Sequence, residues 1–238
     1  MRTQKMIMLI VMSAMLAGVA SIIVVFLWLG AGLGAIVIAA AAAALAVFVV
    51  VVLRPWYNRW GATDNELTMN MPGDELIEGA GSVTRAIGIA AEAPDVWPWL
   101  VQIGFGRAGW YSYDWIDNDG DPSADEIIPE YQTLGVGDKI LMMPDMGFTV
   151  TAIDPDRSIV SMLDGGTTSW CLCLYPQELG GTRLVSRWRN KWGKITAANA
   201  LMIVLTDPGT FIMEQKMLRE IRKRAERSTA TGTKSTDP

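Results

Sequence analysis

The chain begins with two long apolar runs separated by a glycine-rich turn. No charged residue occurs from Met6 to Leu29 or from Ala31 to Leu53. Each run has about 23 residues and would extend roughly 35 Å as a helix, more than the roughly 30 Å of a bilayer's hydrocarbon core. Because the turn is too short to cross a bilayer, the pattern predicts a transmembrane helical hairpin in residues 1–54, with spans at about 6–29 and 31–53.

The positive charges around the hairpin predict its orientation. Arg2 and Lys5 precede the first span and Arg54 and Arg59 follow the second, whereas the turn between the spans has no charge. Positive residues favour the cytoplasmic side of a membrane. We therefore expect a multi-pass protein of the cell inner membrane, with both ends of the hairpin and the rest of the chain in the cytoplasm.

Two alternatives concern the same region. A signal peptide could be cleaved near Ala17–Ala20, but the apolar run continues unbroken past that point and a second complete span follows it. The spacing of Ala35, Ala39 and Ala43 gives the second span a stripe of small residues. That stripe could seat the first helix, which we prefer, or a second copy of the chain in a homodimer.

After the hairpin the pattern changes from continuous apolar runs to short alternating ones. Residues 55–80 have few apolar anchors and contain the turn-forming Met71–Asp74, so they are predicted to form a linker. A helix is expected from Ala93, a short helix at Ser123–Glu130 behind a serine cap, and a long helix from Asp207 to about Arg227. The polar residues 228–238 are predicted to be disordered. Alternation of side chains predicts strands at Val83–Ile89, Lys139–Met143, Phe148–Ile153, Ser158–Leu163, Ser169–Tyr175 and Thr182–Trp188.

This order of elements predicts an α+β domain at residues 81–227. One strand and its helices are followed by an antiparallel meander and then by one long helix. A curved antiparallel sheet around the C-terminal helix buries the apolar faces of both.

Several motifs resemble a known family. They are Val96–Gly104 (VWPWLVQIG), Gly106-Arg107 with Trp110–Asp114 (WYSYD), Ser123–Asp125, Val136–Asp138 and Phe211–Leu218. With these motifs, residues 65 to 227 resemble bacterial, membrane-anchored members of the START-like (SRPBCC) superfamily. The resemblance implies a helix-grip fold with a hydrophobic cavity between the sheet and the long helix. It also implies binding of lipids, quinones, steroids or polyketides, or the activity of a cyclase.

Composition excludes several classes of function. The 238 residues leave room for one hairpin and one ordinary domain, and the net charge of −5 provides no basic field that would attract nucleic acid. The chain has no histidine, which excludes Ser-His-Asp and Cys-His catalysis and ordinary zinc enzymes. An acidic loop at 117–126 does not fit an EF-hand, because Trp115 would occupy the first ligand position. The sequence therefore indicates no cofactor and no metal.

The only cysteines, Cys171 and Cys173, form a C-x-C pair in a predicted strand. Alternation puts both on one face of the strand, where they are poorly placed to bridge each other. We interpret them as small buried side chains; a two-cysteine metal site is the alternative.

Charged and aromatic residues of the domain are the candidates for a ligand site. A buried Arg–Asp pair could orient a polar head group or polarise a carbonyl. Alternatively, these charges brace a loop or meet solvent. The basic end of the last helix is either a solvated face or a contact for anionic lipid. The candidate ligand-binding residues are Arg85, Trp99, Arg107, Trp110, Tyr111, Tyr113 and Asp114.

These observations favour a membrane-tethered protein that binds or transfers a hydrophobic small molecule, such as a lipid, a quinone or a polyketide-like compound. Its partners would be the bilayer and that molecule. Because no complete catalytic set is present, a cyclase or dehydratase that uses Tyr, Asp and Arg is the alternative. A third hypothesis is a non-enzymatic scaffold whose cavity is filled by its own Trp and Met side chains.

Overall fold

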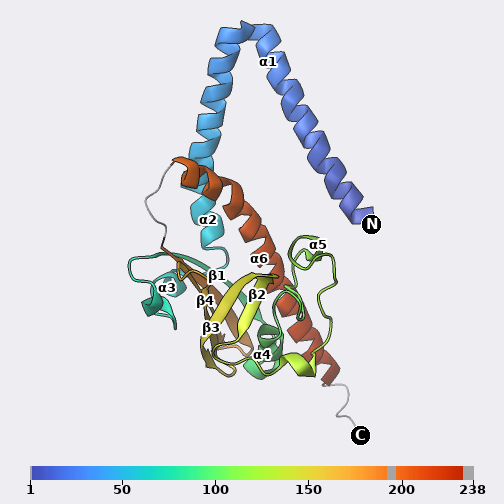
Figure 1. Cartoon of the computed structure of the whole chain (residues 1–238), viewed down its shortest axis with the longest axis vertical. Helices are drawn as coiled ribbons and strands as arrows, with labels where there is room; N and C mark the ends of the chain where they lie inside the picture. Colours follow the sequence, from blue (N-terminus) through green and yellow to red (C-terminus); the bar gives the residue numbers. More distant parts are fainter. Residues whose placement is uncertain (1, 192–196, 233–238) are drawn as a thin grey trace. The chain divides into compact units, whose positions relative to one another are not determined.

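The computed structural model describes residues 2–191 and 197–232. The chain separates into two compact units, Met1–Leu53 and Arg54–Pro238 (Figure 1).

The first unit is helical. α1 (Arg2–Phe48) is interrupted at Gly30, whose φ of 72° and ψ of 163° are not helical, and a π-helical turn, η1 (Val49–Leu53), follows it. Glycine adopts this backbone conformation without the steric cost that a side chain brings, so the break falls where the sequence predicts a turn. Within the described residues one helix, Gly32–Asn58, is long and apolar enough to cross a membrane, and the apolar helix Ala20–Gly30 is shorter. The residues described in full thus supply one helix of the predicted length, and part of the first predicted span lies outside them.

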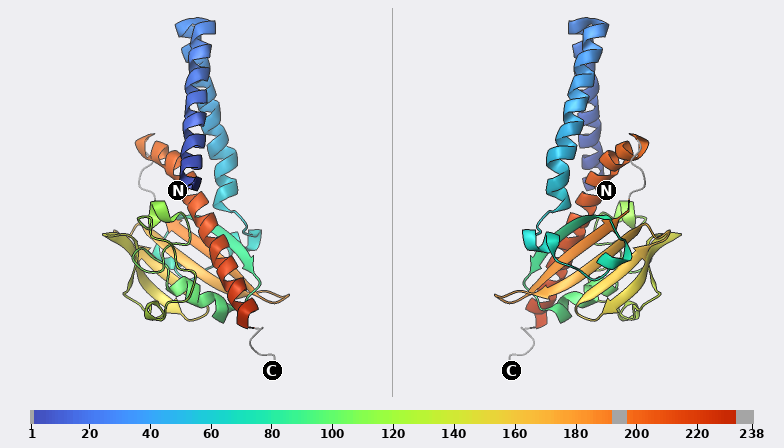
Figure 2. Two further views of the ribbon diagram at one scale, coloured as in Figure 1. Left: turned by 90° about the vertical axis from the view of Figure 1, so that its right-hand side faces the viewer. Right: turned by 90° about the vertical axis from the view of Figure 1, so that its left-hand side faces the viewer.

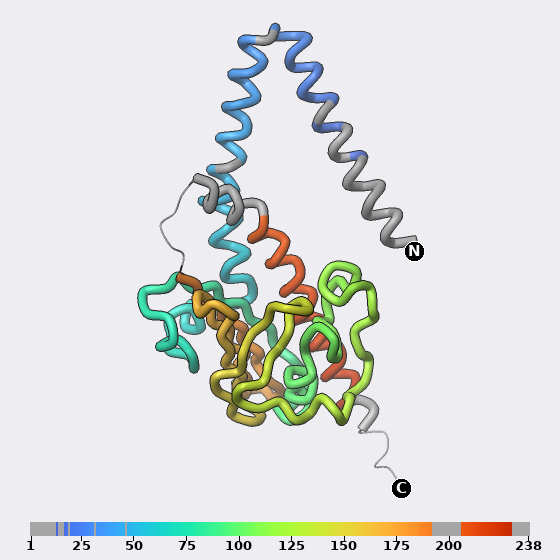
Figure 3. The backbone as a smooth tube through the Cα atoms, viewed as in Figure 1, coloured from blue at the N-terminus to red at the C-terminus, as the bar shows by residue number. Residues whose placement is uncertain are grey.

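The second unit is an α+β domain built on a six-stranded antiparallel sheet, which confirms the predicted fold class. The strands lie in the order β1-β6-β5-β4-β3-β2, so the meander from β2 to β6 closes against β1. Figure 3 traces the path of the chain through this domain. Every predicted strand is present, with ends that differ by a few residues. The strands are β1 (Gly81–Ile89), β2 (Lys139–Met143), β3 (Met146–Asp154), β4 (Ser158–Leu163), β5 (Thr168–Pro176) and β6 (Thr182–Asn190).

The long helix α6 (Ala197–Gly232) covers one face of this sheet. Figure 2 shows it in front of the strands in one view and behind them in the other. Its Leu218, Ile221 and Ala225 are completely buried in one core with Phe148 and Leu184 of the sheet. The arrangement of sheet and helix fits a helix grip. The shorter helical elements are α2 (Arg54–Asn58), α3 (Asp64–Thr68), η2 (Asp74–Leu76), α4 (Ala93–Val101), α5 (Asp114–Asp117) and η3 (Pro129–Tyr131).

Residues 55–80 are folded onto the domain, so the prediction of a linker is wrong. Met71 is buried against the sheet face opposite α6, and a Cβ on Gly73 would lie only 2.4 Å from Val160. Arg187 of β6 fixes this segment by donating to Asp74 at 2.7 Å and to the carbonyl of Met69 at 2.8 Å. The sequence gives no local sign of these contacts, because their partners are more than 100 residues apart.

Two helix predictions also need correction. Residues 123–128 form no helix, because the Ser123 hydroxyl accepts from the amide of Tyr111 at 2.9 Å instead of capping a turn. The helical part of the predicted range is limited to the start of the 3₁₀ turn η3. α6 begins before Asp207, accommodates Pro208, and reaches Gly232, five residues past the predicted end at Arg227. The hydroxyl of Ser228 bonds back to the Arg224 carbonyl at 3.0 Å, which is compatible with a helical backbone. The rest of the predicted disordered tail, 233–238, lies outside the described residues.

The sheet, α6 and α2 are joined by a buried ion pair, which gives the first prediction. Arg85 of β1 pairs with Glu214 of α6 and donates to the carbonyl of Tyr57 in α2 at 2.9 Å. Removing one member strands a buried charge, so Glu214→Ala is expected to cost about 3–5 kcal/mol of unfolding free energy. Denaturant unfolding of the purified chain in detergent measures this cost.

The exposed Glu75 provides the matched control, and Glu75→Ala should change stability by less than about 0.5 kcal/mol. Equal stability of the two variants would show that the buried pair does not hold the domain together.

Candidate functional site

The interior between the sheet and α6 is filled by the chain's own aromatic side chains. Trp170 and Trp188 stack with ring centroids 5.1 Å apart, and Phe148 lies 5.6 Å from Trp170. Trp110 closes the stack at 5.8 Å from Trp170. The cavity that the resemblance implies for this place is therefore occupied by indole and phenyl rings in the structure.

Two indole groups in this interior have unused hydrogen-bond donors. Among the described residues, the buried Nε1 atoms of Trp99 and Trp110 have no hydrogen-bond partner. Trp99 comes from α4 and meets the ring of Tyr111 edge to face at 6.0 Å. An unpaired N–H in an apolar interior costs free energy, and a ligand oxygen that accepted from it would recover that cost.

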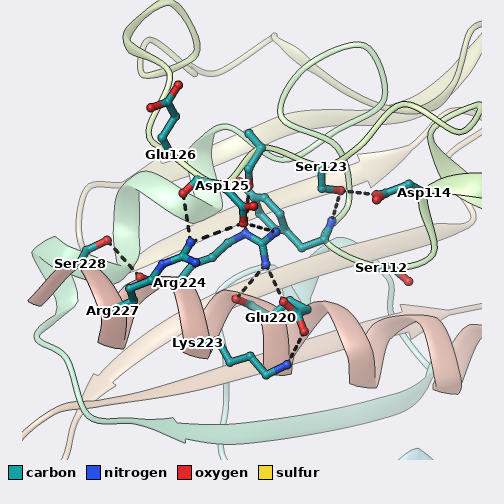
Figure 4. A network of polar contacts seen from close by, with 12 residues as sticks. Ser112, Asp114, Ser123, Asp125, Glu126, Glu220, Lys223, Arg224, Arg227 and Ser228 are labelled. Atoms are coloured by element: carbon teal, nitrogen blue, oxygen red, sulfur yellow. Dashed lines mark hydrogen bonds and ion pairs between the residues drawn. The ribbon is translucent and has the colours of Figure 1, made fainter. Parts of the chain in front are cut away.

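A small polar pocket opens between α6 and the loop that precedes and follows α5. Its volume is about 200 Å³. Figure 4 shows part of its lining, with Ser123 and Asp114 on the loop side and Glu220 on the helix. The pocket is lined by Tyr111, Ser112, Asp114, Ser123, Lys216, Glu220 and Arg224.

The loop side of the pocket is shaped by a close approach of two chain segments. Gly109 has a φ of +78°, and a Cβ there would lie 2.4 Å from the Ser123 hydroxyl, so only glycine fits. This hydroxyl donates to Asp114 Oδ1 at 2.5 Å. Tyr111 has a positive φ of 53° and turns its ring into the core, where it forms a wall between the pocket and the aromatic interior.

On the helix side the pocket has two cations in different electrostatic situations. Arg224 lies over the Tyr111 ring at 4.9 Å and is neutralised by Glu220 at 2.7 Å and Asp125 at 3.0 Å (Figure 4). Lys216 donates to the carbonyl of Ser112 and lies 4.2 Å above the ring of Tyr113. No carboxylate pairs with Lys216 among the described residues, so it brings an ammonium group without an ion-pair partner to a pocket whose lining also includes the carboxylates of Asp114 and Glu220.

Burial keeps the Tyr111 phenol protonated. It raises the pKa of Tyr111 far above its ordinary value, although a hydrogen bond from Gln102 to the phenol oxygen, at 2.8 Å, acts in the opposite direction. The phenol therefore acts as a neutral hydrogen-bonding group at physiological pH.

The structure does not bring the residues of the predicted Arg–Asp pair together. Arg85 pairs with Glu214, and Arg107 donates to the carbonyls of Val101 and Tyr131 at 2.9 and 2.8 Å. Burial lowers the pKa of Arg107. Both arginines lie outside the lining of the polar pocket and brace the fold, and Asp114 bonds to Ser123 instead.

Of the other predicted candidates, Tyr111 and Asp114 line the pocket, Tyr113 lies beside it under Lys216, and Trp99 and Trp110 lie in the interior. The sequence argument missed Ser112 and Ser123 and assigned the basic residues of the last helix to solvent or lipid. The sequence contains one indication of the helix side of the pocket. Positions 216, 220 and 224 are four residues apart and therefore share one helix face.

The comparisons with known proteins do not extend beyond the fold. No family model matches the chain, and no curated protein matches it. A polyketide-cyclase-like protein of Corynebacterium glutamicum is similar in structure at 16% identity and a TM-score of 0.38, over 64% of this chain and 96% of its own. An AHSA1-like protein of Aeromonas hydrophila has 16% identity and a TM-score of 0.36, over 63% and 94%. The di-domain ARO/CYC protein StfQ of the steffimycin biosynthetic pathway has 12% identity and a TM-score of 0.36, over 63% and 51%.

Asp117, beside the pocket, gives a prediction about pH. Burial, reinforced by the charge of Asp114, raises the pKa of Asp117. Its contribution to stability is therefore complete below the unfolded-state pKa and is lost as the pH rises through the folded-state pKa. Asp117→Asn, neutral at every pH, should raise the melting temperature at pH 7, and the gain should shrink toward pH 4.

Thermal unfolding across this pH range measures the difference, and Asp121→Asn at an exposed position of the same loop serves as control. A gain that is constant with pH would argue against the titration of Asp117 as its source.

Proposed function

We propose that this chain is a membrane-tethered protein that binds a hydrophobic small molecule carrying an anionic or carbonyl head group. The observation that carries the proposal is the ammonium group of Lys216. It lies in a pocket between the long helix and an adjoining loop and pairs with no carboxylate in the part of the chain that the structure describes. A charged donor of this kind stabilises an acceptor by about 1.5–3 kcal/mol.

The size of the pocket limits what it can hold. A volume of about 200 Å³ corresponds to roughly six or seven water molecules at about 30 Å³ each. This is enough for a head group and too little for a lipid or a polycyclic ring system. The apolar remainder of the ligand would therefore lie beyond the pocket.

We place that remainder in the aromatic interior behind Tyr111. Tyr111 contacts Trp99 on the interior side and Arg224 on the pocket side, so a rotation of its ring would connect the two spaces. The indole N–H groups of Trp99 and Trp110, which have no partner among residues 2–191 and 197–232, would then offer donors to a ligand oxygen. Such a ligand would displace part of the aromatic stack, which makes binding dependent on repacking of these rings.

The apolar N-terminal unit supports the proposal of a tether. The most apolar part of the helix Gly32–Asn58 is not buried inside the protein, and a helix of this kind is stable in a bilayer. We propose that a second span precedes it and that the domain faces the cytoplasm, as the positions of Arg2, Lys5, Arg54 and Arg59 favour. A tether would keep the binding domain where apolar ligands partition.

The ligand hypothesis is tested on the full chain purified in detergent. Mass spectrometry of extracted small molecules should find a compound with an acidic or carbonyl group in the wild type. Loss of the Lys216 charge in Lys216→Gln should reduce its affinity by about tenfold or more. Lys139→Gln, at an exposed lysine on β2, is the matched control and should keep the ligand.

Equal melting temperatures would establish that the variants are folded. An empty wild-type protein, or a ligand that Lys216→Gln retains in full, would contradict the proposed site. A compound that is converted during incubation would instead favour the enzyme hypothesis.

The tether and its orientation are tested separately on membranes. The chain should stay in the membrane fraction after an alkaline carbonate wash, because two apolar spans cannot be released by breaking electrostatic contacts. In inverted inner-membrane vesicles, added protease should digest the domain. Release by carbonate, or protection of the domain in these vesicles, would disprove the tether or the orientation, respectively.

A further inference from the structure

A compact group of sulfur-containing side chains lies on the sheet face opposite α6. Cys171 and Cys173 of β5 are free thiols, 4% and 2% exposed, and their sulfurs are 3.1 Å apart. The predicted burial on one face is confirmed, but the two side chains lean together along the strand so that the sulfurs touch. Met71 is buried in the same cluster, and Met69 packs against it.

A groove gives this cluster a route to solvent. The groove has a volume of about 640 Å³ and lies between α3 and the end of the β5–β6 hairpin. Met69 and Tyr175 line the groove and also pack against the cysteine cluster. A small ion that entered the groove would therefore meet a thioether first and the two thiols behind it.

The charged side chains that cover the cluster have a net positive charge, which favours an anionic centre beneath them. Arg183 pairs with Glu66 at 2.7 Å, Arg187 with Asp74 at 2.7 Å, and Arg189 with Asp74 at 3.7 Å. This network has three positive groups against two negative ones and so a net charge of +1. Arg187 is also the cross-strand neighbour of Cys171.

The contact between the sulfurs makes them release protons unequally. The Cys171 thiol can donate to Cys173, which lowers the pKa of Cys173 despite its burial. The hydrogen bond with Cys173 and burial raise the pKa of Cys171, and losing the second proton would also put two negative charges in contact. A bound cation would remove that obstacle by lying between the two thiolates.

We propose that Cys171 and Cys173, with Met71 as a third ligand, bind one soft monovalent metal ion, Cu⁺ or Ag⁺. Thiolate and thioether sulfur are the ligands that Cu⁺ prefers. Two S–H bonds break, two metal–sulfur bonds form and two protons pass to solvent, with no change in oxidation state. The resulting centre has a charge of −1, which the covering network of +1 compensates.

Other metals fit this group less well. Structural zinc requires four ligands, usually cysteine and histidine, and the chain has no histidine. Among the described residues no group of three or more His, Cys, Asp and Glu side chains is placed to hold an ion. The sulfur cluster thus suits an ion of low coordination number.

The test uses the full chain, reduced and kept without oxygen in detergent. Cu⁺ is offered as its coloured bicinchoninate complex, and loss of colour measures transfer to the protein. The wild type should take up one Cu⁺ per chain. Cys171→Ala and Cys173→Ala should each lower the affinity at least tenfold, and Met71→Leu should lower it several-fold. Met143→Leu, at an exposed methionine of β2, should leave it unchanged.

Because the sulfurs are buried, the chain is also purified without oxygen from cells grown with added copper, and its metal content is measured. Thermal unfolding confirms that each variant is folded, since alanine keeps a small apolar side chain at both positions. Absence of copper by both routes overturns the proposal. Equal uptake by the cysteine variants, or conversion of the pair to a disulfide without metal retention, also overturns it. None of these outcomes depends on Lys216 or on the ligand proposed for the other face.

Discussion

The buried ion pair between Arg85 and Glu214 is the contact on which the architecture of the domain depends. Glu214 also accepts hydrogen bonds from the Ser186 hydroxyl and, at 3.0 Å, from Trp188 Nε1. Its buried charge is therefore compensated by residues of two strands, β1 and β6. Burying two charges is costly unless the geometry and the additional hydrogen bonds are right, and the pair therefore specifies one rotation of α6 about its axis. At about 100° per residue, this rotation directs positions 217, 218, 221 and 225 to the sheet and 216, 220 and 224 to the loop. The pocket exists because the ion pair fixes the helix.

The strands and the order of the elements could be predicted because their signal is local. Alternation in Ser169–Tyr175, for example, puts Trp170 and Leu172 in one core and Cys171 and Cys173 in the other, as the structure shows. The fold of residues 55–80 could not be predicted, since its apolar residues, such as Tyr57, Met71 and Ile77, follow neither a helical nor a strand period. This segment is held by arginines more than 100 residues away. Residue type alone does not reveal such pairings.

Contacts between residues that are far apart in the sequence also explain why only some of the predicted site residues lie at the pocket. The sequence does not distinguish the environments of its arginines. In the structure, Arg85 is paired within the core, Arg107 donates to backbone carbonyls, and Arg224 lines the pocket. Lys216 has a carbonyl and an aromatic ring as partners, as Arg107 does, but Lys216 lines the pocket and Arg107 does not. The structure has the predicted aromatic residues in or near the interior, where their rings fill the space. Whether the rings rotate away for a ligand depends on energies that no sequence pattern contains.

The sheet separates two regions with different physical character. On the α6 side, large rings are held by packing, and access requires the concerted movement of side chains such as Tyr111, Trp99 and Trp110. On the other side, small side chains lie under a segment that is fixed mainly by ion pairs, including the partly exposed pairs of Arg183 and Arg189. Partly solvated ion pairs contribute little net free energy, so that segment can open at lower cost than the aromatic interior. A bulky ligand on one face and a small ion on the other would therefore reach their sites by independent movements, and a mutation that affects one should leave the other intact.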